Sequence, residues 1–315
     1  MSTFGAGHAL PRPVPRDRFR GALLGLAVGE ALGAPAEFLT ATQVRERWGV
    51  LDEMVGGGCH GVCPGEATDA TEMMLALAES LVAVGEFEPE DVVSRYRAWF
   101  AGGPRDCALT TRTVMLALSS GTPWDVASRR AHEVLGFPQA GNGSIMRCAP
   151  VALRYVRDPE ARRRNTLRES TLTHYDHLAG WSCVAFNELV VAAMADSLPE
   201  SLPAIAAALD DEDSRVAGAL RDALDAEPDE IHATSFVIDS LRAAVWAVLR
   251  TTTFEDALIE IVNRGGDCDA VGAVAGALAG ARYGADAIPA RWLEPLLVRD
   301  AVTAVADALA DRADG

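Results

Sequence analysis

Three short segments of the chain concentrate side-chain oxygens of the kind that bind hard metal ions. One contains Glu37, just after Pro35, and the other two open segments with helical periodicity at residues 68–72 and 265–270. Carboxylates together with a hydroxyl suit Mg²⁺ or Mn²⁺ rather than zinc. The double glycine at 265–266 permits a tight turn with positive φ, which would aim Asp267 and Asp269 at one point. The three segments together predict a metal site.

Helix capping is the alternative interpretation of the same aspartates. Asp69 with Glu72 three residues later has the spacing of a capping box, and Asp269 could serve as an N-cap. Such caps stabilise a helix by about 1 kcal/mol and need no metal. Capping and metal binding are also compatible, because an aspartate has two oxygens.

A fourth segment, Gly141-Asn142-Gly143-Ser144, has the small and polar residues of a loop whose N–H groups approach a phosphate, and taken alone it is more simply explained as an ordinary turn. His174 lies near a predicted helix start and is either structural or part of a site. Phe236 could stack on a nucleobase, and core packing is the interpretation we favour for it.

Several other chemistries are excluded or disfavoured. The chain has no lysine, which excludes a Schiff base and a P-loop. The sequence contains no G-x-S-x-G elbow of the kind that indicates a serine hydrolase. The run Cys59-His60-Gly61-Val62-Cys63 lacks a second ligand pair and the usual zinc spacing. The net charge of −17 disfavours nucleic acid and anionic membranes as partners.

The elements that must position these residues are helices. Apolar residues recur at helical spacing over 74–81 and 241–249, and strand alternation is nearly missing. Glycines recur every fourth residue over 21–33 and again over 272–284. Each glycine inside a helix costs roughly 0.5–1 kcal/mol relative to alanine, so we expect close backbone contact between these two helices to recover that cost. This would bring opposite ends of the sequence together in one all-helical domain.

The cellular compartment that we expect follows from two features that the sequence lacks. We find no signal peptide in residues 1–20 and no run of about 18 uninterrupted apolar residues, so we expect a cytoplasmic protein without a membrane span. Its six cysteines are then reduced thiols. Cys268, between two aspartates, is interpreted as a buried packing residue.

In their order, these segments resemble the ADP-ribosylglycohydrolase family. The similar pieces are RFRGALLGLAVGEALGAPAEF, TDATEMMLALAESL, GNGSIMRCAP, STLTH, VIDSLRAAVWAVL and NRGGDCDAVGAVAGALAGARYG. The resemblance implies an all-α fold, a single compact helical domain over 18–315 with a central cleft, after an N-terminal extension over 1–17. It also implies two Mg²⁺ or Mn²⁺ ions and hydrolysis of a ribosyl N- or O-glycosidic bond in ADP-ribose, a related nucleotide conjugate or an ADP-ribosylated substrate.

Site residues carry over by the same resemblance. The metal ligands fall on Glu37, Thr68, Asp69, Asp267 and Asp269, and the acid–base carboxylates on Glu37, Asp69 and Asp267. The ligand-binding residues fall on Gly141, Asn142, Gly143, Ser144 and His174.

The chain departs from the family where ligands are expected. Ala70 stands in place of an aspartate and Ala270 in place of a hydroxyl residue, while Glu30 and Ala67 replace a usual aspartate and tryptophan. Losing a ligand and a charge predicts one ion in place of two, or none. The leading hypothesis is a divergent glycohydrolase with an altered site. The alternatives are a weak or inactive relative that binds ADP-ribose-like ligands, and the same scaffold used for another reaction on a nucleotide-like metabolite.

Overall fold

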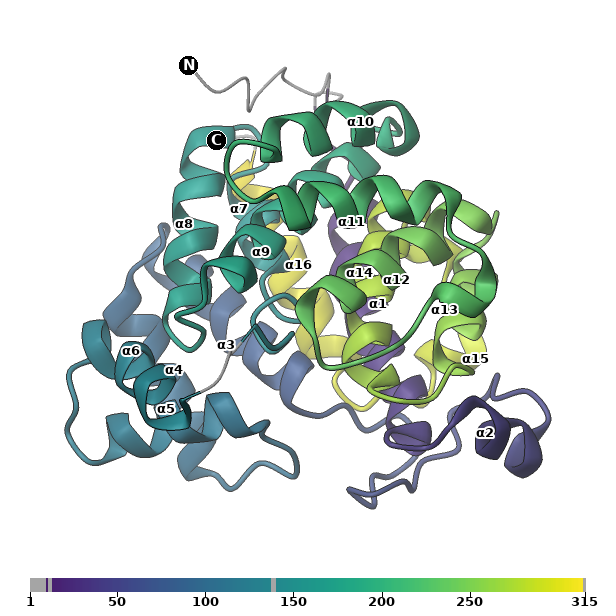
Figure 1. Ribbon diagram of the computed structural model, residues 1–315, viewed down its shortest axis with the longest axis horizontal. Coiled ribbons are helices and arrows are strands. Elements are labelled where there is room, and N and C mark those ends of the chain that lie inside the picture. The colour runs from purple at the N-terminus through teal and green to yellow at the C-terminus, as the bar shows by residue number, and fades with distance from the viewer. Residues whose placement is uncertain (1–9, 11–12, 137–139, 314–315) are drawn as a thin grey trace.

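The protein is described by a computed structural model that covers residue 10 and residues 13–136 and 140–313. Over this part of the chain the secondary structure is sixteen α-helices and three short 3₁₀ helices, with no β-strand, which confirms the predicted all-α class (Figure 1). Of the predicted N-terminal extension, Arg16 and Asp17 belong to the first helix.

The α-helices run in chain order as follows: α1 (Arg16–Gly33), α2 (Ala41–Trp48), α3 (Asp69–Val84), α4 (Pro89–Ala101), α5 (Leu109–Ser119), α6 (Trp124–Leu135), α7 (Ala149–Arg154), α8 (Pro159–Thr171), α9 (His177–Met194), α10 (Leu198–Leu209), α11 (Ser214–Asp225), α12 (Val237–Arg250), α13 (Phe254–Val262), α14 (Cys268–Tyr283), α15 (Ala290–Leu293) and α16 (Arg299–Ala313). The 3₁₀ helices are η1 (Ala34–Ala36), η2 (Pro228–Glu230) and η3 (Ala285–Ala287).

The two glycine-lined helices, α1 and α14, form the centre of the fold. They are antiparallel, and their glycines meet in pairs: Gly21 with Gly280, Gly25 with Gly276, and Gly29 with Gly272. A Cβ atom at Gly25 would lie 2.2 Å from the carbonyl oxygen of Gly276, far inside van der Waals contact. Only glycine permits this approach, so the predicted close contact of the two ends of the sequence is confirmed.

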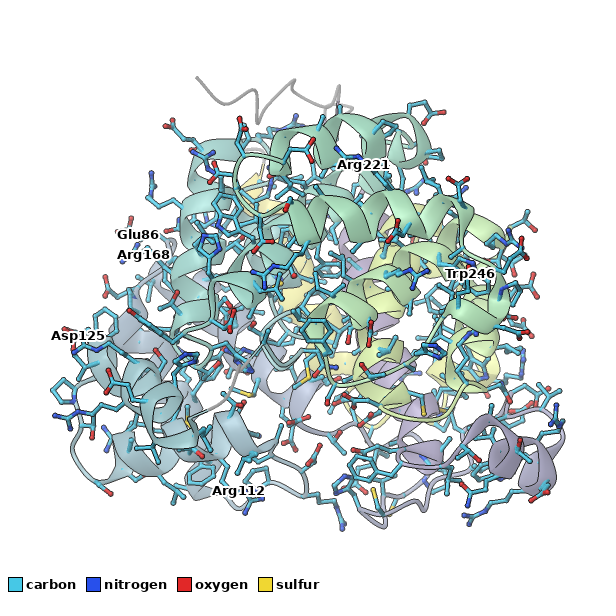
Figure 2. The ribbon with its side chains drawn as sticks, in the orientation of Figure 1. Glu86, Arg112, Asp125, Arg168, Arg221 and Trp246 are labelled. Carbon is cyan, nitrogen blue, oxygen red and sulfur yellow. The ribbon has the colours of Figure 1, made fainter. Side chains whose placement is uncertain are left out.

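Other helices surround this pair. α12, α13 and α9 pack against α14, and α16 packs against α1 and α3. α4, α5 and α6 gather on one side of the molecule, away from α2 (Figure 1). The predicted apolar faces are buried, including Met74, Leu77 and Leu81 on α3. Charged side chains such as Arg112 and Asp125 lie at the rim of the molecule (Figure 2).

α9 is a core helix, although its length and composition would allow it to cross a membrane. Its mean hydropathy is 1.2 over 18 residues, and 94% of that stretch is buried within the fold. It also carries Glu188, whose carboxylate is held by Arg162 at 2.7 Å, and Asn187, which donates a hydrogen bond to Thr166. Polar groups satisfied in this way are typical of the core of a globular protein.

Candidate active site

The site is assembled by a backbone connection between two distant loops. Gly265 and Gly266 have φ values of 66° and 70°, as the sequence predicts. The N–H of Phe38 donates to the carbonyl oxygen of Gly266 at 2.7 Å, and the N–H of Gly266 donates to that of Leu39 at 2.7 Å. This reciprocal pair fixes Glu37, at the end of η1, beside the first turn of α14.

Carboxylates from four parts of the chain converge at this point. Oxygens of Glu37, Asp106 and Asp269 lie within 4.8 Å of one another. Asp267 and Asp69 complete a set that we call the carboxylate cluster, since both lie close enough for their charges to act on the other members. At such separations two carboxylates repel by about 3 kcal/mol for an effective dielectric constant near 20.

Burial and mutual repulsion both disfavour the charged forms. Burial is the largest cause that raises the pKa of Glu37, Asp69, Asp267 and Asp269. Neighbouring carboxylates raise each of these pKa values further. Among the described residues, two of the buried oxygens, Asp69 Oδ2 and Asp269 Oδ1, have no hydrogen-bond partner. These are the oxygens available to a hard cation.

Asp106 is the member of the cluster that the sequence interpretation missed. It lies in the loop between α4 and α5, and 21% of its side chain is exposed, more than for Glu37. It belongs to none of the three oxygen-rich segments. The one available signal was its place in a Pro-Arg-Asp-Cys loop just before a helix, which does not distinguish it from other loop aspartates.

The capping interpretation of Asp69 and Glu72 is wrong. The N-terminus of α3 is capped from another helix, because Glu30 on α1 accepts hydrogen bonds from the N–H groups of Ala70 and Thr71 at 2.8 and 3.1 Å. Glu72 instead accepts from the indole of Trp99 at 2.6 Å. With its N–H donors already satisfied, α3 leaves Asp69 free to face the cluster.

Three neighbouring predictions can be checked in the same region. Thr68 is buried and donates its hydroxyl hydrogen to Glu30 at 2.9 Å, so its oxygen lone pairs remain available to a cation. Asp269 lies inside α14 and is not the N-cap, because Asp267 precedes the helix. Cys268 is fully buried and contacts the carbonyl oxygen of Gly33, as expected for a packing residue. Ala70 and Ala270 are buried and supply no ligand atom.

A pocket of about 370 Å³ adjoins the cluster. Its lining includes Gly141, Asn142, Gly143, His174 and Phe236, together with residues 108–110 that follow Asp106. The amide of Asn142 donates to Asp267 Oδ2 at 2.9 Å, which joins the pocket to the carboxylates. This volume lies within the usual range for small-molecule sites.

Two predictions for residues near the pocket need correction. Ser144 does not line the pocket, because it is fully buried and its hydroxyl contacts Ser170 at 2.9 Å. The core-packing interpretation of Phe236 is wrong, since this residue is 43% exposed and lines the pocket. Phe236 is the N-cap residue that precedes α12, whereas Val237, the first residue of the helix, is fully buried.

His174 presents one defined nitrogen to the pocket. Burial and the charge of Arg147 lower its pKa to about 3, so the ring is neutral. Arg147 donates to the Thr173 hydroxyl at 2.7 Å, and that hydroxyl lies 2.8 Å from His174 Nδ1. Because the Thr173 oxygen already accepts from Arg147, its hydroxyl hydrogen is free to be donated. Among the described residues, His174 Nδ1 is the acceptor within reach of that hydrogen. We therefore assign the ring proton to Nε2, which approaches the backbone of Gly141 and Gly143.

Comparisons with known proteins agree on one family. A model of the ADP-ribosylglycohydrolase family matches residues 11–315. The chain is 34% identical to the ADP-ribosyl-[dinitrogen reductase] glycohydrolase of Rhodospirillum rubrum, over 90% of this chain and 92% of that protein. It is 33% identical to an ADP-ribosylarginine hydrolase of Pseudomonas putida, over 94% of this chain and 79% of that protein. A solved structure titled as an ADP-ribosylglycohydrolase-related protein complex superposes with a TM-score of 0.80 at 35% identity, covering 95% of this chain and 98% of the other.

Proposed function

The chain belongs to the ADP-ribosylglycohydrolase family, and on that premise we propose that it hydrolyses the N- or O-glycosidic bond that joins ADP-ribose to an ADP-ribosylated substrate. The observation that carries the proposal is the junction at Asn142. A small-molecule pocket and a carboxylate cluster share this residue, so a ligand in the pocket would place its ribose against the carboxylates.

A hard divalent cation, Mg²⁺ or Mn²⁺, is part of the proposal. The donor set fits it, because Asp69 and Asp269 each hold a buried oxygen that has no partner within the described part of the chain, and a buried unpaired charge is costly. The residues that would hold the ion are Glu37, Thr68, Asp69, Asp267 and Asp269. When bound, it would polarise ribose hydroxyls and position a water molecule. One hard ion is proposed in place of two, because Ala70 and Ala270 supply no oxygen.

The chain's own residues would bind and orient the ligand. His174 Nε2–H is a hydrogen-bond donor directed at the loop of Gly141 and Gly143, where a phosphate or ribose oxygen would accept it. A Cβ at Gly143 would lie 2.9 Å from the imidazole, so glycine leaves this approach open. The exposed ring of Phe236 offers a surface on which a nucleobase can stack.

Proton transfer falls to the carboxylates. Burial raises the pKa of Glu37, so this side chain can hold a proton closer to neutral pH and give it to the leaving atom, after which its carboxylate would be free to hold the ion. Asp267 is oriented by Asn142, and Asp69 by the start of α3. Both are placed to hold the ribose and the attacking water rather than to exchange protons with solvent.

The alternative function is binding of ADP-ribose-like ligands with weak or no catalysis. The replacement of two expected ligands by the buried Ala70 and Ala270 is the observation that favours it. In that case the pocket, His174 and Phe236 would retain their roles, and the carboxylate cluster would not turn substrate over.

The test is release of ADP-ribose from arginine-linked and serine-linked conjugates in Mg²⁺ or Mn²⁺, followed by mass spectrometry. We expect turnover that falls at least about 100-fold in Asp69→Asn, which keeps the side-chain shape. Asp210→Asn is the matched control, because Asp210 is an exposed residue paired with Arg221. Saturable ADP-ribose binding without turnover of either conjugate would overturn hydrolysis and establish the binding alternative.

A further inference from the structure

A glycine-rich loop before α3 presents two side chains to the carboxylate cluster that the proposed hydrolysis does not use. Gly57 and Val62 close the loop by exchanging backbone hydrogen bonds of 2.7 and 3.0 Å. Gly58 has a φ of 71°, and a Cβ there would lie 2.4 Å from the carbonyl oxygen of Ala34, so the loop is pressed against η1. This contact holds Cys59 and His60 over Glu37.

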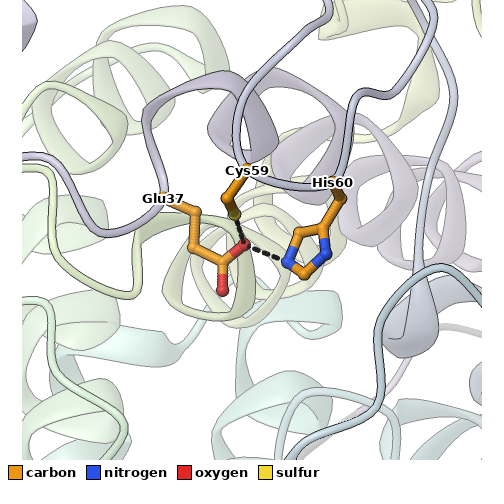
Figure 3. A group of neighbouring side chains, drawn as sticks. All are labelled: Glu37, Cys59 and His60. Atoms are coloured by element: carbon orange, nitrogen blue, oxygen red, sulfur yellow. Dashed lines mark hydrogen bonds and ion pairs between the residues drawn. The ribbon is translucent and has the colours of Figure 1, made fainter.

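Cys59 and His60 converge on a single carboxylate oxygen of Glu37 (Figure 3). His60 Nε2 lies 2.7 Å and Cys59 Sγ 3.2 Å from Glu37 Oε2. One candidate ligand atom from each residue lies within 4.8 Å of the others. The sequence Cys59-His60-Gly61-Val62-Cys63 lacks a second ligand pair, and the fold supplies a third donor from a residue 22 positions earlier.

Sulfur, imidazole nitrogen and one carboxylate oxygen are a donor set for a borderline metal. Zinc binds them at about 2.3, 2.0 and 2.0 Å, and tetrahedral angles then place the sulfur about 3.5 Å and the nitrogen about 3.3 Å from the oxygen. The distances in the structure are 3.2 and 2.7 Å. Opening the group by about half an ångström would admit the ion. We propose that Glu37, Cys59 and His60 form a zinc site at the edge of the carboxylate cluster.

The surroundings of this trio also indicate a cation. Asp106 lies 3.8 Å from His60 Nε2. Asp269 is 2% exposed, has an oxygen for which the residues that the structure describes supply no partner, and offers an oxygen within 4.8 Å of Glu37 and Asp106. The trio has three protein ligands, which leaves a fourth position for water or a fourth carboxylate, as in open zinc sites.

Ion binding at this site would release the proton of the Cys59 thiol, and that of Glu37 where this carboxyl is protonated. The Cys59 thiol gives its hydrogen to solvent and binds as thiolate, while His60 binds as neutral imidazole through Nε2. No oxidant or second reactant is required. The site shares Glu37 with the hard-cation proposal and adds a thiol and an imidazole that the hard-cation proposal leaves unused.

The experiment uses the full chain, stripped of metal under reducing conditions and titrated with Co²⁺ in excess Mg²⁺. Co²⁺ reports on zinc sites, because thiolate ligation adds a sulfur-to-metal charge-transfer band. We expect this band to saturate at one equivalent and to disappear when Zn²⁺ is added. Cys59→Ser should abolish the band and weaken Zn²⁺ binding at least about 100-fold, since even outer-shell losses cost about 10–100-fold.

Two controls isolate the trio. Cys63→Ser removes an exposed thiol of the same loop and should leave the band unchanged. Asp69→Asn should abolish hydrolysis and keep the band, which separates this inference from the proposed function. No charge-transfer band, or a band that survives in Cys59→Ser, would overturn the zinc site. Cys59 is exposed, so its serine variant is expected to fold.

Discussion

Replacing Gly25 with alanine tests the central helix pair directly. The new Cβ would lie 2.2 Å from the carbonyl oxygen of Gly276, whereas ordinary contact begins near 3.4 Å. α1 and α14 would have to separate by about 1 Å, because the atom that is met is backbone and has no rotamer to change. The same separation would disturb Glu37 and Asp267, which lie just beyond the ends of these helices.

The magnitude follows from two opposing effects. Overpacking of a dense core costs about 1–3 kcal/mol, and the rigid neighbour places Gly25→Ala near the upper end. Alanine in a helix interior is favoured over glycine by about 0.5–1 kcal/mol. Gly218→Ala in α11 carries the second effect alone, because a Cβ there meets nothing within 4 Å. The helix preference of alanine is the same in both variants. The difference between their free energies of unfolding therefore measures the cost of the contact between α1 and α14.

Urea unfolding of both variants and the parent chain measures this difference. We expect Gly218→Ala to stabilise the protein by about 0.5–1 kcal/mol and Gly25→Ala to lie about 3 kcal/mol below it in free energy of unfolding. Equal unfolding midpoints for the two variants, with equal slopes, would refute the close approach of α1 and α14.

Three further predictions concern the pocket and cluster. Thr173→Val removes the hydroxyl that fixes His174 Nδ1 as acceptor, and we expect calorimetry to show ADP-ribose affinity reduced about threefold to tenfold. The pKa of His174 is lowered to about 3, below its unfolded value, so stability should fall on acidification below about pH 6 by on the order of 1 kcal/mol per pH unit. His174→Gln should lose less between about pH 7 and pH 5 in urea unfolding, and an equal loss would contradict the assignment. Mg²⁺ or Mn²⁺ should raise the Tm of the parent chain and of Asp210→Asn, and a comparable rise in Asp69→Asn would argue against the cluster as the binding site.

The fold could be predicted because its main constraint, the close contact of two helices, appears in the sequence as a repeat of glycine at every fourth residue. Glycine every fourth residue in two segments indicates two helix faces without side chains, and only mutual contact explains both. The turn at Gly265 and Gly266 could be predicted for a similar reason, because two adjacent glycines before two aspartates indicate positive φ.

The contacts of the site that could not be predicted are those between residues far apart in the sequence. Asp106 carries no local pattern, and its place in the cluster follows from the packing of α4 and α5. Glu30 caps α3 from another helix, so the local capping box at Asp69 and Glu72 was a misleading signal. Glu37 completes the set of Cys59 and His60 only after the loop folds against η1. Each of these is a tertiary contact that spacing along the chain does not encode.

The pairing of α1 with α14 also governs when the molecule can be completed during synthesis. Gly21 and Gly280 are contact partners separated by most of the chain. At roughly 5–20 residues per second, the ribosome needs on the order of 10–50 s to make α14 after α1 has emerged. Throughout that interval the glycine-lined face of α1 has no partner. The nascent chain therefore has an unfinished centre until α14 is made, and the carboxylate cluster cannot form before that point.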